Sequence, residues 1–231
     1  MERAALLRWL ESRFLRRHLH GRGVEIGALW RRFPVPRGTE VWYADRLSEA
    51  ALLEHYPELK GRILPSDLVA DAAQLPVAPA SLDFLIASHL LEHLPFPLAA
   101  LRAWYEALAP GGVLLLKIPD KRYTFDAPRH RTPLAHLLEE YEHPERFDAR
   151  HHYEDWVEHV GGRVRGTPAF DQEVQDLIRR DYSIHFHVWT DNDIRDMIDF
   201  TRKEWNLSWS PVLFWPAHFY RKETTVVLRK M

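Results

Sequence analysis

Three ionisable side chains follow an apolar stretch of the chain. Residues 81–88 read SLDFLIAS, and His89, Glu92 and His93 come directly after them. Ionisable side chains are costly to bury without partners, so this corner is either exposed to solvent or forms the rim of a site. Because a histidine can take or give a proton near neutral pH, His89 and His93 are candidates for acid–base chemistry, and we favour the rim.

A second group of histidines lies in the sequence HFHVW, where His185 and His187 are two positions apart. In an extended segment both side chains point to one face. We expect them to line a substrate site, with purely structural histidines as the alternative. A metal ion held together with His143, His151 or His152 is a further alternative. We assign no metal, because no nearby carboxylate gives the spacing of a known site.

The elements that must position these side chains can be predicted from the apolar pattern. Strands are expected over residues 23–27, 40–45, 67–72, 81–88 and 113–118, and helices over residues 2–19, 48–59 and 97–108. The run VLLLKI at 113–118 is nearly all apolar, which is typical of a parallel strand covered on both faces. Alternating strands and helices predict a doubly wound α/β sheet.

The alternation ends near residue 120. Helices are predicted over residues 132–160, with Thr132 and Pro133 at the start, over 171–182, and over 191–205 with Thr190 as the cap. Two β-rich stretches, 207–215 and 218–230, are expected to pair antiparallel at the edge of the sheet. We therefore expect one domain over residues 1–231, with an N-terminal helix in 1–20 and a helical insertion over 121–184.

Composition restricts the class of protein. The formal net charge is −2 over 231 residues, which gives no electrostatic footprint for nucleic acid. No apolar run approaches the roughly 20 residues that a bilayer requires, and we expect a soluble, cytoplasmic protein without a membrane span. The absence of cysteine excludes disulfides and a thiolate nucleophile. The 16 prolines and the scarcity of Asn, Gln and Met favour a heat-adapted source, with compositional drift as the alternative.

The order of these pieces resembles the class I S-adenosylmethionine-dependent methyltransferases, specifically the type 11-like group. The resemblance rests on VEIG at 24–27, VWYAD at 41–45, DAAQLP at 71–76 and the whole run of strand, helix, Pro-Gly-Gly turn and strand over 81–120. It implies a Rossmann-like, mostly parallel sheet of about seven strands. It also implies an antiparallel C-terminal edge, with the helical insertion placed after the fifth strand.

The resemblance implies S-adenosylmethionine as the cofactor, at the carboxyl ends of the strands where open α/β sheets bind ligands. Gly27 would allow a close backbone approach, Asp45 would accept from the ribose hydroxyls, and Glu25 would lie near the methionine end. Plain turn or capping roles for these residues are the alternative. Asp71 and Ala72 would lie near the adenine. The full set of expected cofactor residues is Glu25, Gly27, Asp45, Arg46, Asp71, Ala72, Ser88 and His89.

The sequence departs from the family pattern after the first strand. In EIGALWRRFPVP only Gly27 remains of the usual glycine-rich turn, and Pro34 and Pro36 interrupt the helix that should follow. A dinucleotide dehydrogenase is disfavoured more strongly, because the G-x-G-x-x-G that would hold a pyrophosphate is missing.

The implied reaction is methyl transfer to a polar small molecule, with a sugar or glycan precursor as the class we favour. A hydroxyl acceptor needs a base, for which the candidates are His89, His93 and His185. The insertion is expected to cover the site. The residues expected to meet the acceptor are Asp120, Arg122, Tyr123, His185 and His187, with loop anchoring as an equal alternative for the first three. Two rival functions are a non-catalytic nucleoside-binding protein and a histidine-based metal-dependent hydrolase.

Overall fold

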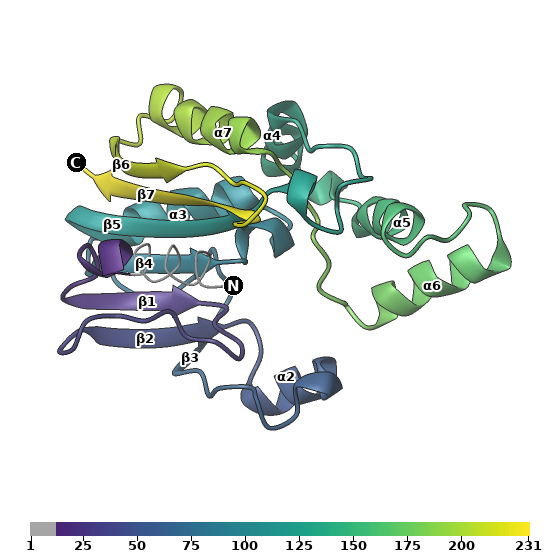
Figure 1. Ribbon diagram of the computed structural model, residues 1–231, viewed down its shortest axis with the longest axis horizontal. Coiled ribbons are helices and arrows are strands. Elements are labelled where there is room, and N and C mark those ends of the chain that lie inside the picture. Colours follow the sequence, from purple (N-terminus) through teal and green to yellow (C-terminus); the bar gives the residue numbers. More distant parts are fainter. Residues whose placement is uncertain (1–12) are drawn as a thin grey trace.

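Seven strands form one mixed sheet in the part of the chain that the structure, a computed structural model, describes, which is residues 13–231 (Figure 1). The order is β3-β2-β1-β4-β5-β7-β6, with β7 antiparallel to both β5 and β6 and the other neighbours parallel. This confirms the predicted fold class. The strands are β1 (Arg22–Ile26), β2 (Glu40–Asp45), β3 (Leu68–Val69), β4 (Leu82–Ser88), β5 (Leu108–Pro119), β6 (Trp209–Trp215) and β7 (Glu223–Lys230).

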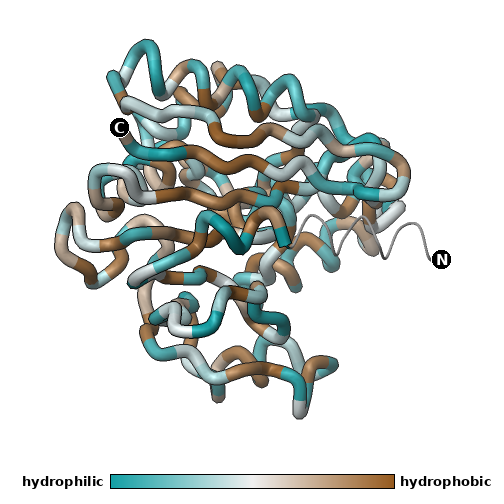
Figure 2. Tube along the Cα trace, turned by 60° about the vertical axis from the view of Figure 1, so that its left-hand side comes forward, coloured by the Kyte–Doolittle hydropathy of each residue, from teal (hydrophilic) through white to brown (hydrophobic). Residues whose placement is uncertain are grey.

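Helices cover one face of the sheet and extend beyond its carboxyl edge. They are α2 (Glu49–His55), α3 (Pro97–Ala107), α4 (Leu134–Glu142), α5 (Ala149–His159), α6 (Pro168–Arg179) and α7 (Asp191–Lys203). Helices α3, α4 and α7 pack against one face of the sheet and form the larger hydrophobic core. On the opposite face, Leu15 and Leu19 contribute to a smaller core. Apolar residues are concentrated in the central strands, as Figure 2 shows. Most of the helix expected over 2–19 lies outside the described residues, although residues 13–16 are helical.

Several predicted boundaries change in the structure. The third strand is only Leu68–Val69, and the segment after β1 forms no helix, as its prolines predict. The helix expected over 132–160 is two helices, because Pro144 follows the end of α4. Thr132 does not cap α4 and instead accepts a hydrogen bond from the Val188 N–H. The predicted cap of α7 is confirmed, since Thr190 and Asp193 form a capping box.

The inserted helices lie beyond the carboxyl ends of the parallel strands. In Figure 1, α5 and α6 project to the right of the sheet, whereas α4 lies beside α7. The insertion has a small core, which the Phe186 side chain joins from just beyond it; the other buried members are Tyr153, Val157, Phe170, Val174, Leu177 and Ile184. No helix within residues 13–231 combines the length and the hydropathy that crossing a membrane requires.

Candidate active site

Four strands present polar side chains on the same face at the carboxyl edge of the sheet. Side chains alternate along a strand, so Ser88 and Lys117 follow the buried Ile86 and Leu115 on that face. Glu25 on β1 belongs to the same face, and so does a residue at the start of the antiparallel β7, Glu223. These residues line a cleft of about 540 Å³, whose other wall consists of residues 27–34 and Leu15.

The turn after β1 closes one side of this cleft. Gly27 has φ +70°, and its N–H donates to the carbonyl of Ala44 at 2.8 Å. A Cβ added there would lie 3.0 Å from the side chain of Leu90, so only glycine fits without strain. Further along, the N–H of Phe33 donates to both carboxylate oxygens of Glu25 at 2.9 Å. The segment therefore folds back over the end of its own strand.

Glu25 is the cleft residue whose protonation state changes near neutral pH. Its side chain is buried, and this burial raises its pKa to about 7, although the Phe33 N–H opposes the shift. A carboxyl group that titrates near pH 7 can exchange a proton with a bound ligand.

His89 lies between two carboxylates. Its Nε2 is 3.1 Å from Glu223 Oε2, and its Nδ1 is 3.6 Å from Glu92 Oε1. Lys117 Nζ contacts the other oxygen of Glu223 at 2.5 Å. Burial opposes the charged form of His89, but the hydrogen bond to Glu223 and the negative charge of the nearby Glu92 outweigh it and raise the pKa of His89 above its ordinary value. His89 is therefore an imidazolium at neutral pH, and in that form it cannot accept a proton.

Glu92, His93 and His185 form a second cluster behind His89. Glu92 is buried, and within residues 13–231 its carboxylate oxygens accept no hydrogen bond. His93 Nδ1 lies 2.8 Å from the carbonyl of Ile184, and His185 Nδ1 lies 2.7 Å from a carboxylate oxygen of Asp126. Because each Nδ1 faces an oxygen acceptor, both rings direct Nε2 elsewhere. Burial lowers the pKa of His93 to about 4, so this ring is neutral at pH 7.

Asp45 and Arg46 lie at the end of β2, outside the lining of the cleft. The Asp45 carboxylate is half-buried, which raises its pKa, and it accepts a long hydrogen bond, 3.5 Å, from the Leu47 N–H. Arg46 instead contacts Asp181, beyond the end of α6, at 2.5 Å. The insertion thus reaches across the carboxyl edge to β2.

Asp71 and Ala72 have structural partners next to β3. The exposed Asp71 accepts a hydrogen bond from the Ala73 N–H at 2.7 Å, which is typical of a turn. Ala72 is buried, and its carbonyl accepts a hydrogen bond from Trp104 Nε1 at 2.7 Å. Neither residue lines the cleft.

The segment after β5 is held in place by the buried side chain of Asp120 and does not line the cleft. Asp120 is fully buried and holds Arg122 at 2.6 Å, while its Oδ2 also accepts the Asp191 N–H at 3.2 Å. Asp120 therefore does not reach the cleft, and loop anchoring is the role that its contacts support. Tyr123 lies beside Arg122 and is half-buried, also outside the cleft lining.

His185 and His187 do not share one site, contrary to the expectation from their spacing. His185 joins Glu92 and His93, whereas the fully buried His187 lies with His136 and His152. A fully buried ring cannot line a substrate site unless the chain around it moves.

Sequence reasoning missed Lys117 and Glu223, which complete the charged wall of the cleft. Lys117 could have been predicted, because it is the one charged residue in the apolar run 113–118 and therefore indicates where the strand emerges from the core. Nothing local marks Glu223, since its position depends on where β7 enters the sheet.

Comparison with known proteins agrees with this architecture. A family model described as a methyltransferase domain matches residues 5–165. Comparison with curated protein sequences gave no significant match.

Three solved structures illustrate the shared fold. A methyltransferase from Mesorhizobium loti, described as S-adenosylmethionine dependent, has a TM-score of 0.53 at 15% identity and covers 96% of this chain and 97% of its own. A SAM-dependent methyltransferase from Methanosarcina mazei gives 0.51 at 14% identity, with 94% and 97% covered. A putative Zn-dependent alcohol dehydrogenase from Rhodobacter sphaeroides gives 0.56 at 14% identity, with 95% and 88% covered. At such identities the likeness concerns the fold alone.

Proposed function

The chain belongs to the methyltransferase domain family, and from this premise we propose that it transfers a methyl group from S-adenosylmethionine to a polar small molecule. The proposal of a polar acceptor rests on the charged side of the cleft, which is formed by His89, Lys117 and Glu223. Alternating charges of both signs beside Trp30 suit a ligand with many hydroxyl groups. We favour a sugar or glycan precursor.

The residues at the strand ends fit this cofactor in two respects. Gly27 lines the cleft in a backbone conformation with φ +70°, and a Cβ there would approach Leu90 to 3.0 Å, so the shape of this turn depends on glycine. Asp45 presents a carboxylate at the end of the neighbouring strand, where it can accept from two hydroxyls. We propose that Gly27, Glu25 and Ser88 hold the methionine end and that Asp45 holds the ribose.

When bound, S-adenosylmethionine would supply an electrophilic methyl carbon, to which the acceptor atom would bond as the carbon–sulfur bond breaks and S-adenosylhomocysteine leaves. Lys117 and Glu223, held as an ion pair, would orient the acceptor's hydroxyl groups. His89 would contribute positive charge and hydrogen bonds rather than act as a base.

For the proton of an acceptor hydroxyl, His185 is the base that we favour over His93. Its Nδ1 faces Asp126, which fixes the ring and leaves Nε2 as the proton acceptor. Its Nε2 lies 4.0 Å from Glu92 Oε1, on the side toward His89. Reaching an acceptor in the cleft therefore requires movement of the insertion.

The first experiment is a thermal-shift titration with S-adenosylhomocysteine, with NAD as the control ligand. Selective binding to the folded state stabilises it by about 2.7 kcal/mol at a hundredfold excess over the Kd. Asp45→Ala should remove the shift, whereas Asp196→Ala, an exposed change on α7, should retain it. No shift with folded wild-type protein freed of bound cofactor would refute the cofactor assignment.

A non-catalytic nucleoside-binding protein is the second candidate. It is favoured by the turn after β1, which retains only one glycine, Gly27, and is not followed by a helix. It predicts the same thermal shift but no methyl transfer to a panel of sugars and nucleotide sugars. Transfer of labelled methyl to any of these acceptors, lost in Lys117→Met and Glu223→Gln, would favour the enzyme.

A further inference from the structure

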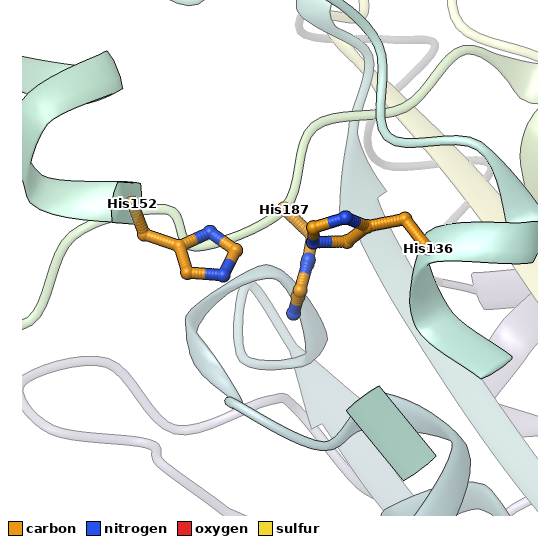
Figure 3. Close-up of side chains that lie close together, drawn as sticks. All are labelled: His136, His152 and His187. Atoms are coloured by element: carbon orange, nitrogen blue, oxygen red, sulfur yellow. The ribbon is translucent and has the colours of Figure 1, made fainter. Parts of the chain in front are cut away.

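Three histidines from separate segments converge between the insertion and the chain that follows it (Figure 3). His136 comes from α4, His152 from α5, and His187 from the extended segment between α6 and α7. One ring nitrogen of each lies within 4.8 Å of the others. His152 and His187 are buried, and His136 is partly exposed. The cluster lies apart from the cleft described above.

A carboxylate lies among the three rings. Glu140 is one helical turn after His136 on α4, so both side chains leave the same face of that helix. Its Oε1 is 2.9 Å from His136 Nε2 and 2.7 Å from His152 Nε2, and its Oε2 is 3.5 Å from His187 Nε2. Oε2 is buried and has no hydrogen-bond partner within residues 13–231. The cluster therefore offers three nitrogen donors and one oxygen donor.

The hydrogen bonds of His152 are not satisfied by a neutral ring. Its Nδ1 is 3.0 Å from the carbonyl oxygen of Phe186, which can only accept, so Nδ1 carries the proton. In a neutral imidazole Nε2 is then a bare lone pair, yet it faces Glu140 Oε1 at 2.7 Å. Two acceptors at that distance repel each other unless a cation or a second proton lies between them.

His187 shows the same arrangement more clearly. Its Nε2 is 3.3 Å from the carbonyl oxygen of Pro95 and therefore carries the proton. Its Nδ1 is left buried, without a hydrogen-bond partner among the described residues. An unpartnered buried polar atom costs about 1–3 kcal/mol, so it calls for a ligand. In metal sites, one ring N–H is typically held by a backbone carbonyl while the other nitrogen binds the ion.

We propose that His136, His152, His187 and Glu140 bind one divalent transition-metal ion, with Zn²⁺ as the best match. Three imidazoles and a carboxylate form a four-donor set of the kind that holds tetrahedral zinc, with metal–nitrogen distances of about 2.0–2.1 Å. All four positions are filled by the protein, so the ion is structural. A hydrolytic metal needs an open position for water, which this set does not leave.

Such an ion would connect α4, α5 and the segment that leads to α7. That segment also carries His185, two residues before His187, to the cluster behind the cleft. The metal would thereby fix α4, α5 and this segment relative to one another. The proposal does not depend on the methyl-transfer function, because its observations concern only this cluster.

The test is metal analysis of the full-length protein without a histidine tag, as purified and after chelation and reloading with zinc. We expect one zinc per chain, bound with a Kd below micromolar, and a melting temperature that falls on chelation and recovers with zinc. His136→Ala should lose both the metal and the chelator sensitivity. Because His136 is partly exposed, its replacement should leave the protein folded even where His187→Ala does not.

Two matched variants make the test specific. His151→Ala changes the exposed neighbour of His152, and His185→Ala disables the cluster of Glu92 and His93; both should retain the zinc. The proposal is overturned if folded wild-type protein binds no zinc below micromolar Kd. It is equally overturned if folded His136→Ala binds zinc as tightly as the wild type.

Discussion

Ionisation of the buried Glu25 should destabilise the folded wild-type protein as pH rises. The variant Glu25→Gln should not show this loss of stability. The side chain is 2% exposed, and burial raises its pKa from 4.5 to about 7. The folded state therefore binds this proton more tightly than the unfolded state does. The resulting stabilisation is complete below pH 4.5 and is lost as pH rises through 7. The difference between the two pKa values, about 2.5, corresponds to about 3 kcal/mol.

Glutamine keeps an oxygen that accepts the Phe33 N–H and has no proton to lose. The variant should therefore gain stability over the wild type by about 2–3 kcal/mol between pH 5 and pH 9. For a chain of this size that gain corresponds to roughly 5–10 °C in melting temperature.

The assay is urea unfolding of both proteins across this pH range, followed by tryptophan fluorescence. The difference between the two proteins isolates Glu25, because every other titrating group is shared. Glu54→Gln, a change of an exposed glutamate on α2, is the control and should give a difference independent of pH. A constant difference for Glu25→Gln as well would mean that Glu25 ionises near its ordinary pKa, and the reasoning from burial would fail.

Three further substitutions and one exposed control probe the framework. Gly27→Ala places a Cβ 3.0 Å from Leu90 at φ +70°, and we expect a loss of at least about 1 kcal/mol in urea unfolding together with weaker binding of S-adenosylhomocysteine. Trp104→Phe removes a buried 2.7 Å hydrogen bond to a backbone carbonyl and should cost about 1–3 kcal/mol by the same measurement. Arg129→Ala should cost about 3–5 kcal/mol, because it leaves two carboxylates without their buried partner, whereas Arg146→Ala in an exposed pair should cost under about 1 kcal/mol.

The sheet could be predicted because its central strands are recognisable from runs of apolar residues in the local sequence. Residues 84–87 and 113–116 are apolar on both faces, which is typical of a covered strand in the middle of a sheet. The position of Gly27 at a strand end followed from the same pattern. The two residues of β3 gave too short a signal to fix its length.

The contacts of the site could not be predicted, because they depend on pairings between distant segments. The spacing of His185 and His187 suggested one face, yet the segment that carries them passes between two clusters and supplies one ring to each. Glu223 meets Lys117 only because β7 enters the sheet beside β5. Local propensity carries no information about that choice of neighbour.

The place of β7 in the sheet has a consequence for the order of folding. It pairs with β5 on one side and with β6 on the other. One edge of β5 therefore stays unpaired until β7 arrives, and β7 follows β5 in the chain only after the insertion, α7 and β6. Closing so long a loop is slow compared with forming the local helices. Refolding should therefore recover helical circular dichroism first and the charged wall of the cleft last, so the capacity to bind an acceptor should lag behind the return of secondary structure.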